Sequence, residues 1–370
     1  MGGAVTALRV GVVGAGKISG AYLSTLRRLS NVGVVAVSDL DEVRARTAAA
    51  TTPGARPLAV ADLLAADEVD LVLNLTIPAA HAEIARAAIA AGKHVYGEKP
   101  LAVTTVEAGA MLAAAACAGV RLGCAPDTVL GTGVQTARAC LDSGEIGTPI
   151  AATAFMVTPG HERWHPAPEF YYQPGGGPLF DMGPYYLTAL VTLLGPVRRV
   201  AGMAAIPRAT RTIGSGPRAG AEIDVAVATH VTGVLEHAHG ALSTLVMSFD
   251  VWAGRLPPIE VYGTAGSLSV PDPNRFGGAV QIFRAGAEDW TPVPEAGGYR
   301  GAARGCGVSD LASALTTGTA HRANGEIAYH VLDVMESLLA AADSGQAVDI
   351  TSSCDRPQAI HLGAHPDDLT

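Results

Sequence analysis

The chain has 370 residues, of which 49% are apolar and 16% are charged, and its formal net charge is −9. Because that length exceeds one ordinary hydrophobic core, we expect two domains. The negative charge and the lack of lysine or arginine clusters exclude nucleic acid as a partner, and the lack of a long uninterrupted apolar run excludes a membrane span. The N-terminus has no signal-like pattern, so a cytoplasmic location is expected. The scattered cysteines lack metal-ligand spacing, so no metal site is predicted.

The first predicted strand and the turn after it have the pattern of a dinucleotide site. An apolar run at residues 8–13 leads into Gly14-Ala15-Gly16-Lys17-Ile18-Ser19-Gly20 and then into an amphipathic stretch. Glycines let the backbone approach a pyrophosphate, and the start of the following helix offers free N–H groups to it. The residues of this turn predicted to contact the cofactor are Gly14, Gly16, Lys17 and Ile18.

A second predicted strand, at residues 34–38, ends in Asp39. A carboxylate at this position accepts hydrogen bonds from the free ribose diol of NAD and repels the 2′-phosphate of NADP. We therefore predict NAD as the cofactor. NADP is the alternative, because Arg44 and Arg46 lie close enough in sequence to fold back and neutralise Asp39.

Strands and helices continue to alternate after Asp39. Helices are predicted near residues 40–50, 59–66, 79–91 and 105–118, and strands at residues 69–76 and 120–124. Thr104 and Glu107 have the spacing of a capping box at the start of the last of these helices. The alternation predicts an α/β fold with a doubly wound, dinucleotide-binding Rossmann domain over residues 1–125.

Residues 126–370 are predicted to form an α+β domain for substrate binding and oligomerisation, with a large, mostly antiparallel open sheet. Its predicted strands are at residues 150–157, 199–206, 223–235, 238–251, 259–262, 267–270 and 280–284. Its predicted helices are at residues 128–144, 181–194, 308–317 and 325–344. Helices should cover one face of the sheet. The other face should pack on a second subunit, since its apolar runs leave no polar side for solvent, which predicts a homodimer or homotetramer.

Two short motifs are candidates for the chemistry. The run Gly97-Glu98-Lys99-Pro100 follows an apolar strand and so places a cation at the carboxyl end of the sheet, where α/β folds bind ligands. The run Phe180-Asp181-Met182-Gly183-Pro184-Tyr185-Tyr186 opens a predicted helix, in which Asp181 is either functional or an N-cap. With the glycine turn and Asp39, these runs resemble the Glu-Lys-Pro signature and the Asp-x-Gly-x-His motif of the Gfo/Idh/MocA oxidoreductases. Tyr185 stands where that motif has histidine.

The resemblance implies a dehydrogenase or reductase that moves a hydride between a nicotinamide and a secondary alcohol or ketone of a sugar, glycoside or cyclitol. It implies that Lys99 supplies positive charge and that Asp181 orients the substrate hydroxyl or Lys99. Tyr185 then carries the proton in place of histidine, with Tyr186 and His165 as competing carriers. The resemblance also implies cofactor contacts after two strands, from Thr76, Pro78, His81, Glu98 and Lys99. For His81 the alternative is a solvent-facing or capping histidine.

Substrate contacts are expected from a loop rich in aromatic residues and histidines, which contains His161-Glu162-Arg163-Trp164-His165 and Phe170-Tyr171-Tyr172. Aromatic rings cover the C–H faces of a sugar, and polar edges bind its hydroxyls. The alternative is a plain surface loop with a buried Trp164. Together with Asp127, which is included for its position after the last nucleotide-domain strand, the predicted substrate-binding residues are Asp127, Trp164, His165, Tyr172, Asp181 and Tyr185.

Two other functions fit the same motifs. One is a non-catalytic, NAD-binding regulator, although the presence of both Lys99 and Asp181 counts against it. The other is a lyase or hydrolase that oxidises and then reduces its substrate on a retained cofactor. A cofactor that survives purification, with no net absorbance change on turnover, would favour this second alternative.

Overall fold

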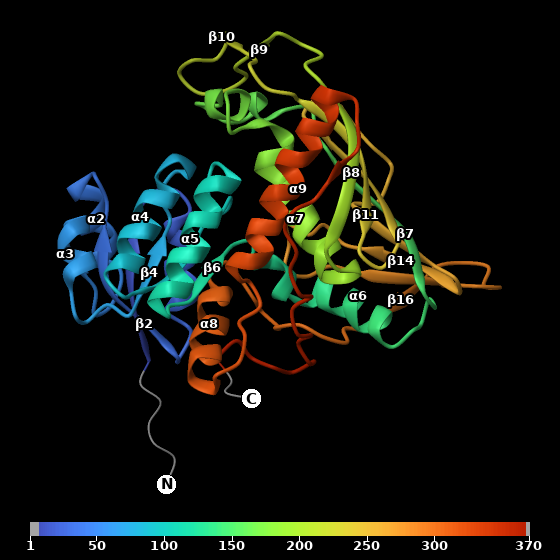
Figure 1. The fold of residues 1–370 in the computed structure, drawn as a ribbon. Helices are drawn as coiled ribbons and strands as arrows, with labels where there is room; N and C mark the ends of the chain where they lie inside the picture. Colours follow the sequence, from blue (N-terminus) through green and yellow to red (C-terminus); the bar gives the residue numbers. More distant parts are fainter. Residues whose placement is uncertain (1–6, 368–370) are drawn as a thin grey trace. The chain divides into compact units, whose positions relative to one another are not determined.

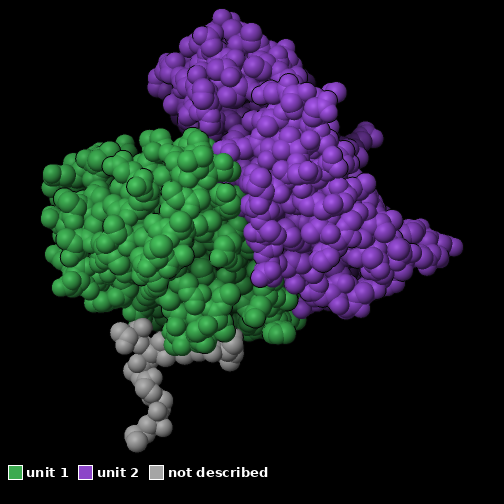
Figure 2. All heavy atoms as spheres, viewed as in Figure 1, with its two compact units in different colours: residues 1–131, 297–329, 357–370 green, residues 132–296, 330–356 purple. Residues whose placement is uncertain are grey.

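The structure is a computed structural model that describes residues 7–367. The chain forms two compact units, which Figure 2 colours separately. Unit 1 contains residues 1–131, 297–329 and 357–370, and unit 2 contains residues 132–296 and 330–356. The predicted single domain boundary after residue 125 therefore differs from the observed division, because residues 297–329 and 357–370 belong to unit 1.

Unit 1 contains the predicted Rossmann fold. Its six strands are all parallel and have the order β3-β2-β1-β4-β5-β6 (Figure 1). The central strands are buried on both faces, as their apolar sequences predict. Only β3 was not predicted, because it is two residues long, exposed and without an apolar pattern. The strands are Leu8–Val13 (β1), Val32–Ser38 (β2), Arg56–Pro57 (β3), Leu71–Asn74 (β4), His94–Gly97 (β5) and Leu122–Cys124 (β6).

Local sequence signals mark both ends of helix α5 in unit 1. The predicted capping box of α5 is present between Thr104 and Glu107, and Gly119 ends that helix with a φ of 68°. Helix α8 comes from the late part of the chain and packs against α1, β2 and β6, which explains why residues 297–329 belong to unit 1. The helices are Ser19–Leu26 (α1), Glu42–Ala50 (α2), Val60–Ala65 (α3), Pro78–Ala90 (α4), Thr105–Ala118 (α5) and Cys306–Thr317 (α8), with a 3₁₀ turn at Thr128–Leu130 (η1).

Unit 2 is built on a nine-stranded sheet with the order β16-β15-β14-β13-β7-β12-β11-β8-β17. The pairing of β12 with β7 is parallel and the other pairings are antiparallel, as predicted for most of the sheet. Its strands are Pro149–Val157 (β7), Val197–Ala205 (β8), His230–His237 (β11), Leu242–Ser248 (β12), Ile259–Gly263 (β13), Gly266–Val270 (β14), Val280–Arg284 (β15), Thr291–Val293 (β16) and Val348–Asp349 (β17).

Two element predictions for this region were wrong. The strand expected over residues 223–235 is two strands, because Glu222–Asp224 (β10) pairs with Thr210–Thr212 (β9) in a separate small sheet. The helix expected over residues 128–144 is interrupted at Gly131, and the α-helical part is Thr132–Asp142 (α6). Both breaks accompany pairing with distant segments, of β10 with β9 and of Gly131 with Tyr299, which the local sequence does not record.

Helices α6 and Gly177–Leu194 (α7) pack against strands of the large sheet (Figure 1). The closing helix Gly325–Ser344 (α9) has the predicted bounds. Between β7 and α7 lies the aromatic loop, which contains two 3₁₀ turns, His161–Arg163 (η2) and Glu169–Tyr172 (η3). This loop and the start of α7 contain the predicted substrate residues of unit 2.

Candidate functional site

The glycine turn after β1 leaves room for a phosphate group. Gly14 has a φ of 103°, and a Cβ placed on it would lie 2.6 Å from the carbonyl oxygen of Leu75, so no larger residue fits. A Cβ on Gly16 would meet nothing within 4 Å, so the backbone there faces open space. Helix α1 starts without a side-chain cap and without an acidic residue in its first turn. Its positive end therefore suits the pyrophosphate of a dinucleotide.

Asp39 is fixed against this turn. One carboxylate oxygen accepts a hydrogen bond from the Ala15 amide at 2.7 Å, and the other accepts one from the Asp41 amide at 2.9 Å. Each oxygen has a second lone pair, so both remain able to accept from a ribose diol. Arg44 and Arg46 do not fold back onto Asp39. Instead they pair with carboxylates at the start of α2, Asp41 at 3.4 Å and Glu42 at 3.1 Å.

Glu98 holds the backbone that presents Lys99. Its carboxylate accepts hydrogen bonds from the Tyr22 hydroxyl at 2.8 Å and from the Lys99 amide at 3.0 Å, and its own amide donates to the Asn74 carbonyl at 2.9 Å. Burial, together with the Glu98 carboxylate, raises the pKa of Tyr22, so the phenol remains a donor. Glu98 was predicted as a cofactor contact, and in this arrangement it positions Lys99.

His81 connects the loops that follow β4 and β5. It is buried, with Nδ1 2.7 Å from the Pro100 carbonyl oxygen and Nε2 3.1 Å from the Thr76 carbonyl oxygen. Burial lowers the pKa of His81. The alternative of a solvent-facing histidine is therefore wrong. Pro78 occupies the first turn of α4, and Thr76 precedes it, so all of these predicted cofactor residues lie at the carboxyl ends of parallel strands, where such folds bind nucleotides.

Asp127 has a different environment from the one predicted for a substrate contact. It is buried, and one carboxylate oxygen accepts hydrogen bonds from the amides of Gly305 at 2.8 Å and Gly307 at 3.1 Å, at the start of α8. Burial raises the pKa of Asp127 to about 6. The carboxylate thus anchors the returning segment of unit 1, and it would have to exchange these partners to reach a substrate.

Asp181 pairs with a histidine that the sequence analysis did not select. Helix α7 begins at Gly177, so the interpretation of Asp181 as an N-cap is wrong. Its Oδ2 lies 3.1 Å from Nε2 of His161, and the two side chains are 18% and 14% exposed. His161 lies in η2, twenty residues before Asp181 in the chain, and no local spacing rule connects a loop residue with a helix at that distance.

Two tyrosines follow Asp181 on α7, and both are buried. Tyr185 is four residues beyond Asp181 and therefore lies on the same side of the helix. Burial, together with Asp272, raises the pKa of Tyr186, so Tyr186 is a poor base at neutral pH. Of these two predicted proton carriers, Tyr185 has the more suitable position.

The aromatic loop exposes two of its large rings, those of Trp164 and Phe170. Trp164 is 53% exposed, so the alternative of a buried Trp164 is wrong. Its ring lies 5.3 Å from the His161 ring and 5.4 Å from the His165 ring. Tyr172, by contrast, is fully buried, accepts a hydrogen bond from the His161 amide at 3.2 Å and donates one to Glu162. Tyr172 thus supports the loop, whereas Trp164 and Phe170 are its exposed large rings.

A cluster of buried charged side chains holds the aromatic loop in position. The Arg211 side chain is 1% exposed and lies between two carboxylates, Glu162 at 3.1 Å and Asp250 at 2.5 Å. Arg211 also donates to the Phe249 carbonyl at 3.0 Å, and Thr229 donates to Asp250 at 2.6 Å. Of this group and the Tyr172 hydroxyl that donates to Glu162, only Tyr172 was predicted, as a substrate contact. We call Arg211, Glu162, Asp250, Thr229 and Tyr172 the buried charge cluster.

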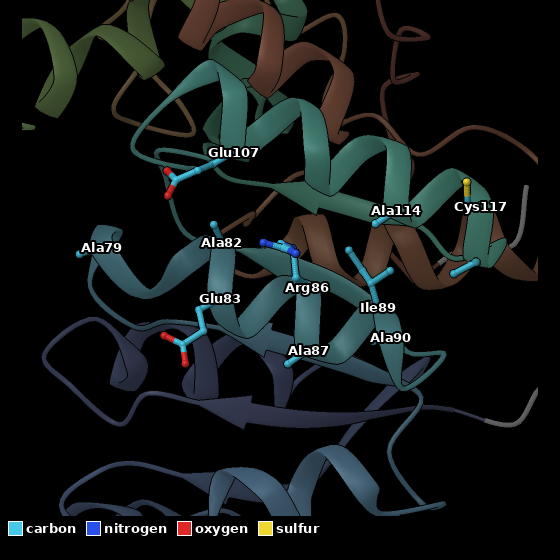
Figure 3. A pocket seen from close by; sticks show the side chains of 11 residues that line it. Ala79, Ala82, Glu83, Arg86, Ala87, Ile89, Ala90, Glu107, Ala114 and Cys117 are labelled. Atoms are coloured by element: carbon cyan, nitrogen blue, oxygen red, sulfur yellow. The ribbon is translucent and has the colours of Figure 1, made fainter.

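A separate hollow of about 960 Å³ lies between α4 and α5 (Figure 3). Alanines form much of its wall, with Glu83, Arg86 and Glu107 as the charged members and Cys117 at one end. None of the predicted site residues lines it, and we assign it no role in the chemistry.

The described residues contain no group of three or more histidine, cysteine, aspartate or glutamate side chains that could hold a metal ion. In residues 7–367, no helix is long and apolar enough to cross a membrane.

Comparison with known proteins identifies both parts of the chain. Residues 8–125 match the NAD-binding Rossmann fold of an oxidoreductase family, and residues 134–269 match the GFO/IDH/MocA C-terminal domain. A 1,5-anhydro-D-fructose reductase of Ensifer adhaerens is 28% identical over 92% of this chain and 98% of its own. A dTDP-3,4-didehydro-2,6-dideoxy-alpha-D-glucose 3-reductase of Streptomyces antibioticus is 33% identical over 78% of this chain and 84% of its own.

A solved structure agrees with the sequence relatives. An NAD binding oxidoreductase from Klebsiella pneumoniae superposes with a TM-score of 0.82 and 26% identity, covering 94% of this chain and all of that one. These matches confirm the predicted oxidoreductase class and the NAD-binding domain. The chain belongs to the Gfo/Idh/MocA family of NAD-binding oxidoreductases.

Proposed function

We propose that this oxidoreductase interconverts a secondary alcohol and a ketone on a sugar, glycoside or cyclitol. The observation that carries the proposal is the exposed Trp164 ring beside the polar pair His161 and Asp181. Such a ring covers the C–H face of a sugar, and the polar pair binds hydroxyls at its edge. Two relatives that are named as reductases of an anhydro-ketose and of a nucleotide-linked keto sugar support the same substrate class.

The residues of this chain bind and orient the substrate and move its proton, while the bound nicotinamide supplies the hydride chemistry. We assign to Lys99 the role of stabilising negative charge on the reacting oxygen, since a fixed cation acts most strongly where charge develops. Glu98 holds the Lys99 amide and so positions that cation. We assign to Asp181 the orientation of the polar group beside it, and Tyr185 as the proton carrier stays a prediction.

The substrate class is tested with a panel of sugars, glycosides, anhydro-sugars and inositols, whose oxidation is measured by the rise in NADH absorbance. The matching ketones test the reverse direction, in which NADH absorbance falls. We expect at least one member to react with a kcat/KM in the ordinary range of enzymes, about 10⁴ M⁻¹s⁻¹ or more. NAD binding without any turnover would favour the regulator. Product formation on a retained cofactor, without net NADH, would favour the lyase or hydrolase.

We propose a preference for NAD over NADP on the basis of the Asp39 carboxylate. It is held at the turn by the Ala15 amide, and the neighbouring arginines are engaged on α2, so a 2′-phosphate would meet an uncompensated negative charge. We expect Asp39→Ser to lower the ratio of kcat/KM with NAD to kcat/KM with NADP at least tenfold. The control Asp62→Asn, which removes an exposed charge from α3 and leaves both arginine pairs intact, should leave the ratio unchanged. Comparable kcat/KM values in the wild type would contradict the assignment.

We also propose that the chain forms a homo-oligomer through the uncovered face of the large sheet of unit 2. Residues on β11 and β12 alternate between buried and exposed, and the exposed set includes Val234, Leu242 and the neighbouring Met203. Their cross-strand register places these three side chains on one face. The same face also has threonines, so it is less apolar than the sequence suggested. Light scattering should give a dimer or larger, and Val234→Lys with Leu242→Lys should give monomers. A monomeric wild type at micromolar concentration would overturn the proposal.

A further inference from the structure

Asp181 has a histidine partner even though this chain lacks the histidine of the family motif. Tyr185 stands at the position where the motif has histidine, which leaves no imidazole one turn beyond Asp181 on α7. Instead, His161 reaches Asp181 from the aromatic loop, with 3.1 Å between Nε2 and Oδ2. The chain therefore keeps an aspartate–histidine pair but takes its histidine from another segment.

The second ring nitrogen of His161 is available for chemistry. Among the described residues, no hydrogen-bond partner of Nδ1 is found, and the side chain is 14% exposed. The ring lies between aromatic neighbours, 4.6 Å from the Tyr171 ring and 4.5 Å from the Phe249 ring. A carboxylate on one nitrogen fixes the tautomer and orientation of the imidazole and stabilises its protonated form. This arrangement is typical of a histidine that transfers protons.

The loop around His161 is held more firmly than an ordinary surface loop. The backbone amide of His161 donates to the buried Tyr172 hydroxyl at 3.2 Å. The next residue, Glu162, is a member of the buried charge cluster and pairs with Arg211 at 3.1 Å. Reacting groups must be held within a fraction of an ångström to be effective, and these contacts give His161 that support.

Resting on the proposed function, we infer that His161, rather than Tyr185, carries the proton of the reacting hydroxyl. In oxidation, Nδ1 takes the hydroxyl proton while the C–O bond becomes a carbonyl. A bound nicotinamide would accept, as hydride, the hydrogen and the electron pair of the C–H bond that breaks. Asp181 stabilises the imidazolium that forms, and the proton then passes to water. Reduction reverses each step. Tyr185 is left with a positioning role on the same side of α7.

The titratable and charged groups that face His161 come from several elements. Asp181 is the charged group in direct contact, from α7. Other titratable or charged groups near it in the described part of the chain include Tyr171 and Tyr172 on η3, Glu162 and His165 close to it in the sequence, Arg211 on β9 and Asp250 after β12. Arg211 is paired with both Glu162 and Asp250.

The test is the pH profile of the hydride step in the wild type, His161→Gln, Asp181→Asn and Tyr185→Phe, with the best substrate of the panel. We expect the wild-type rate of oxidation to rise through a limb below about pH 8, because an imidazole titrates near neutrality and a phenol near 10. His161→Gln should lower kcat by roughly 10²–10⁴ and abolish the limb. Tyr185→Phe should keep the limb. Added imidazole should restore part of the activity of His161→Ala.

The control is His239→Gln, which changes an exposed histidine in a turn of unit 2 and should leave both kcat and the limb unchanged. NADH binding followed by fluorescence should stay within about twofold in His161→Gln, since that residue is assigned to the substrate. If His161→Gln does not fold, the wild-type profile decides, and a limb above about pH 8.5 overturns the inference.

Failure of the two proposals can be told apart. A wild type that oxidises a sugar while His161→Gln keeps a near-normal rate and limb refutes the role of His161 and leaves the substrate class intact. A wild type that oxidises no member of the panel removes the proposed function, and the inference falls with it.

Discussion

The cofactor turn of unit 1 and the His161–Asp181 pair of unit 2 are assembled in different ways. The turn uses residues that are consecutive in the chain, and Asp39 reaches it through the next strand of the same sheet. The pair joins a loop residue to a helix, and buried contacts with β9 and the end of β12 hold the loop in position.

The comparison teaches where sequence motifs are informative. A phosphate site made from backbone N–H groups requires glycine and a helix start at fixed spacing, so its sequence is recognisable. A proton-transfer pair requires only that two side chains meet, and many segments can supply the histidine. Loss of the histidine at position 185 therefore does not establish loss of a histidine from the site.

The largest effect is expected from breaking the support of the His161 loop. Arg211→Met leaves the buried Glu162 and Asp250 carboxylates without their cation and should lower the free energy of unfolding by about 3–5 kcal/mol. Urea unfolding measures this change. The control Arg218→Met removes a solvent-exposed pair with Glu169 and should change stability by about 0–1 kcal/mol. Equal losses in the two variants would show that the buried charge cluster has no special structural role.

A second prediction tests a tertiary anchor of unit 1, the Asp127 carboxylate. Its pKa is raised from an ordinary value near 4 to about 6, so the folded state binds its proton more tightly than the unfolded state. The free energy of unfolding should therefore fall by about 3 kcal/mol as pH rises from about 4 to 6, and this loss should be complete at higher pH.

Asp127→Asn removes this titration but keeps an oxygen that accepts from the Gly305 and Gly307 amides. Urea unfolding of both proteins between about pH 4 and pH 7 isolates the contribution of Asp127, since the other groups cancel in the difference. Parallel pH profiles for the two proteins would contradict the prediction.

A third prediction concerns the local design of the cofactor turn. Gly14→Ala places a Cβ 2.6 Å from the Leu75 carbonyl oxygen on a backbone with a φ of 103°, and the strain should amount to about 1–3 kcal/mol. We expect the Kd for NADH to rise at least tenfold in fluorescence titrations. The matched control is Gly20→Ala in the same segment, where a Cβ meets nothing within 4 Å and the helix gains stability. Unchanged NADH affinity in Gly14→Ala would weaken the assignment of the turn.

The smallest effect is expected from a purely local feature. Thr104→Ala removes the side chain that caps α5 together with Glu107 and should lower the free energy of unfolding by about 1 kcal/mol. Thermal unfolding measures it, with Thr105→Ala, a change inside the first turn of α5, as the control. A loss as large as that of Arg211→Met would reverse the proposed contrast between local and tertiary contributions.

The sequence was a good guide wherever a short pattern has one physical solution. Every strand of the six-stranded parallel sheet was predicted except the two-residue β3. The predicted capping box at Thr104 is present, and α9 has its predicted bounds. Asp39 follows the end of β2, as expected, whereas Asp181 lies inside α7, which begins four residues earlier than predicted. The predictions failed where distant segments pair, as at Gly131 and between β10 and β9.

By itself, the sequence determined the Rossmann fold, the glycine turn with its carboxylate, and the positions of Lys99 and Asp181, because each depends on neighbours within a few residues or on strict alternation of strand and helix. Only the tertiary structure decided that His161 is the partner of Asp181, that Tyr172 and Arg211 hold its loop, and that Asp127 anchors α8. These contacts join segments that are far apart in the chain, and their geometry depends on how whole elements pack, which no local spacing records.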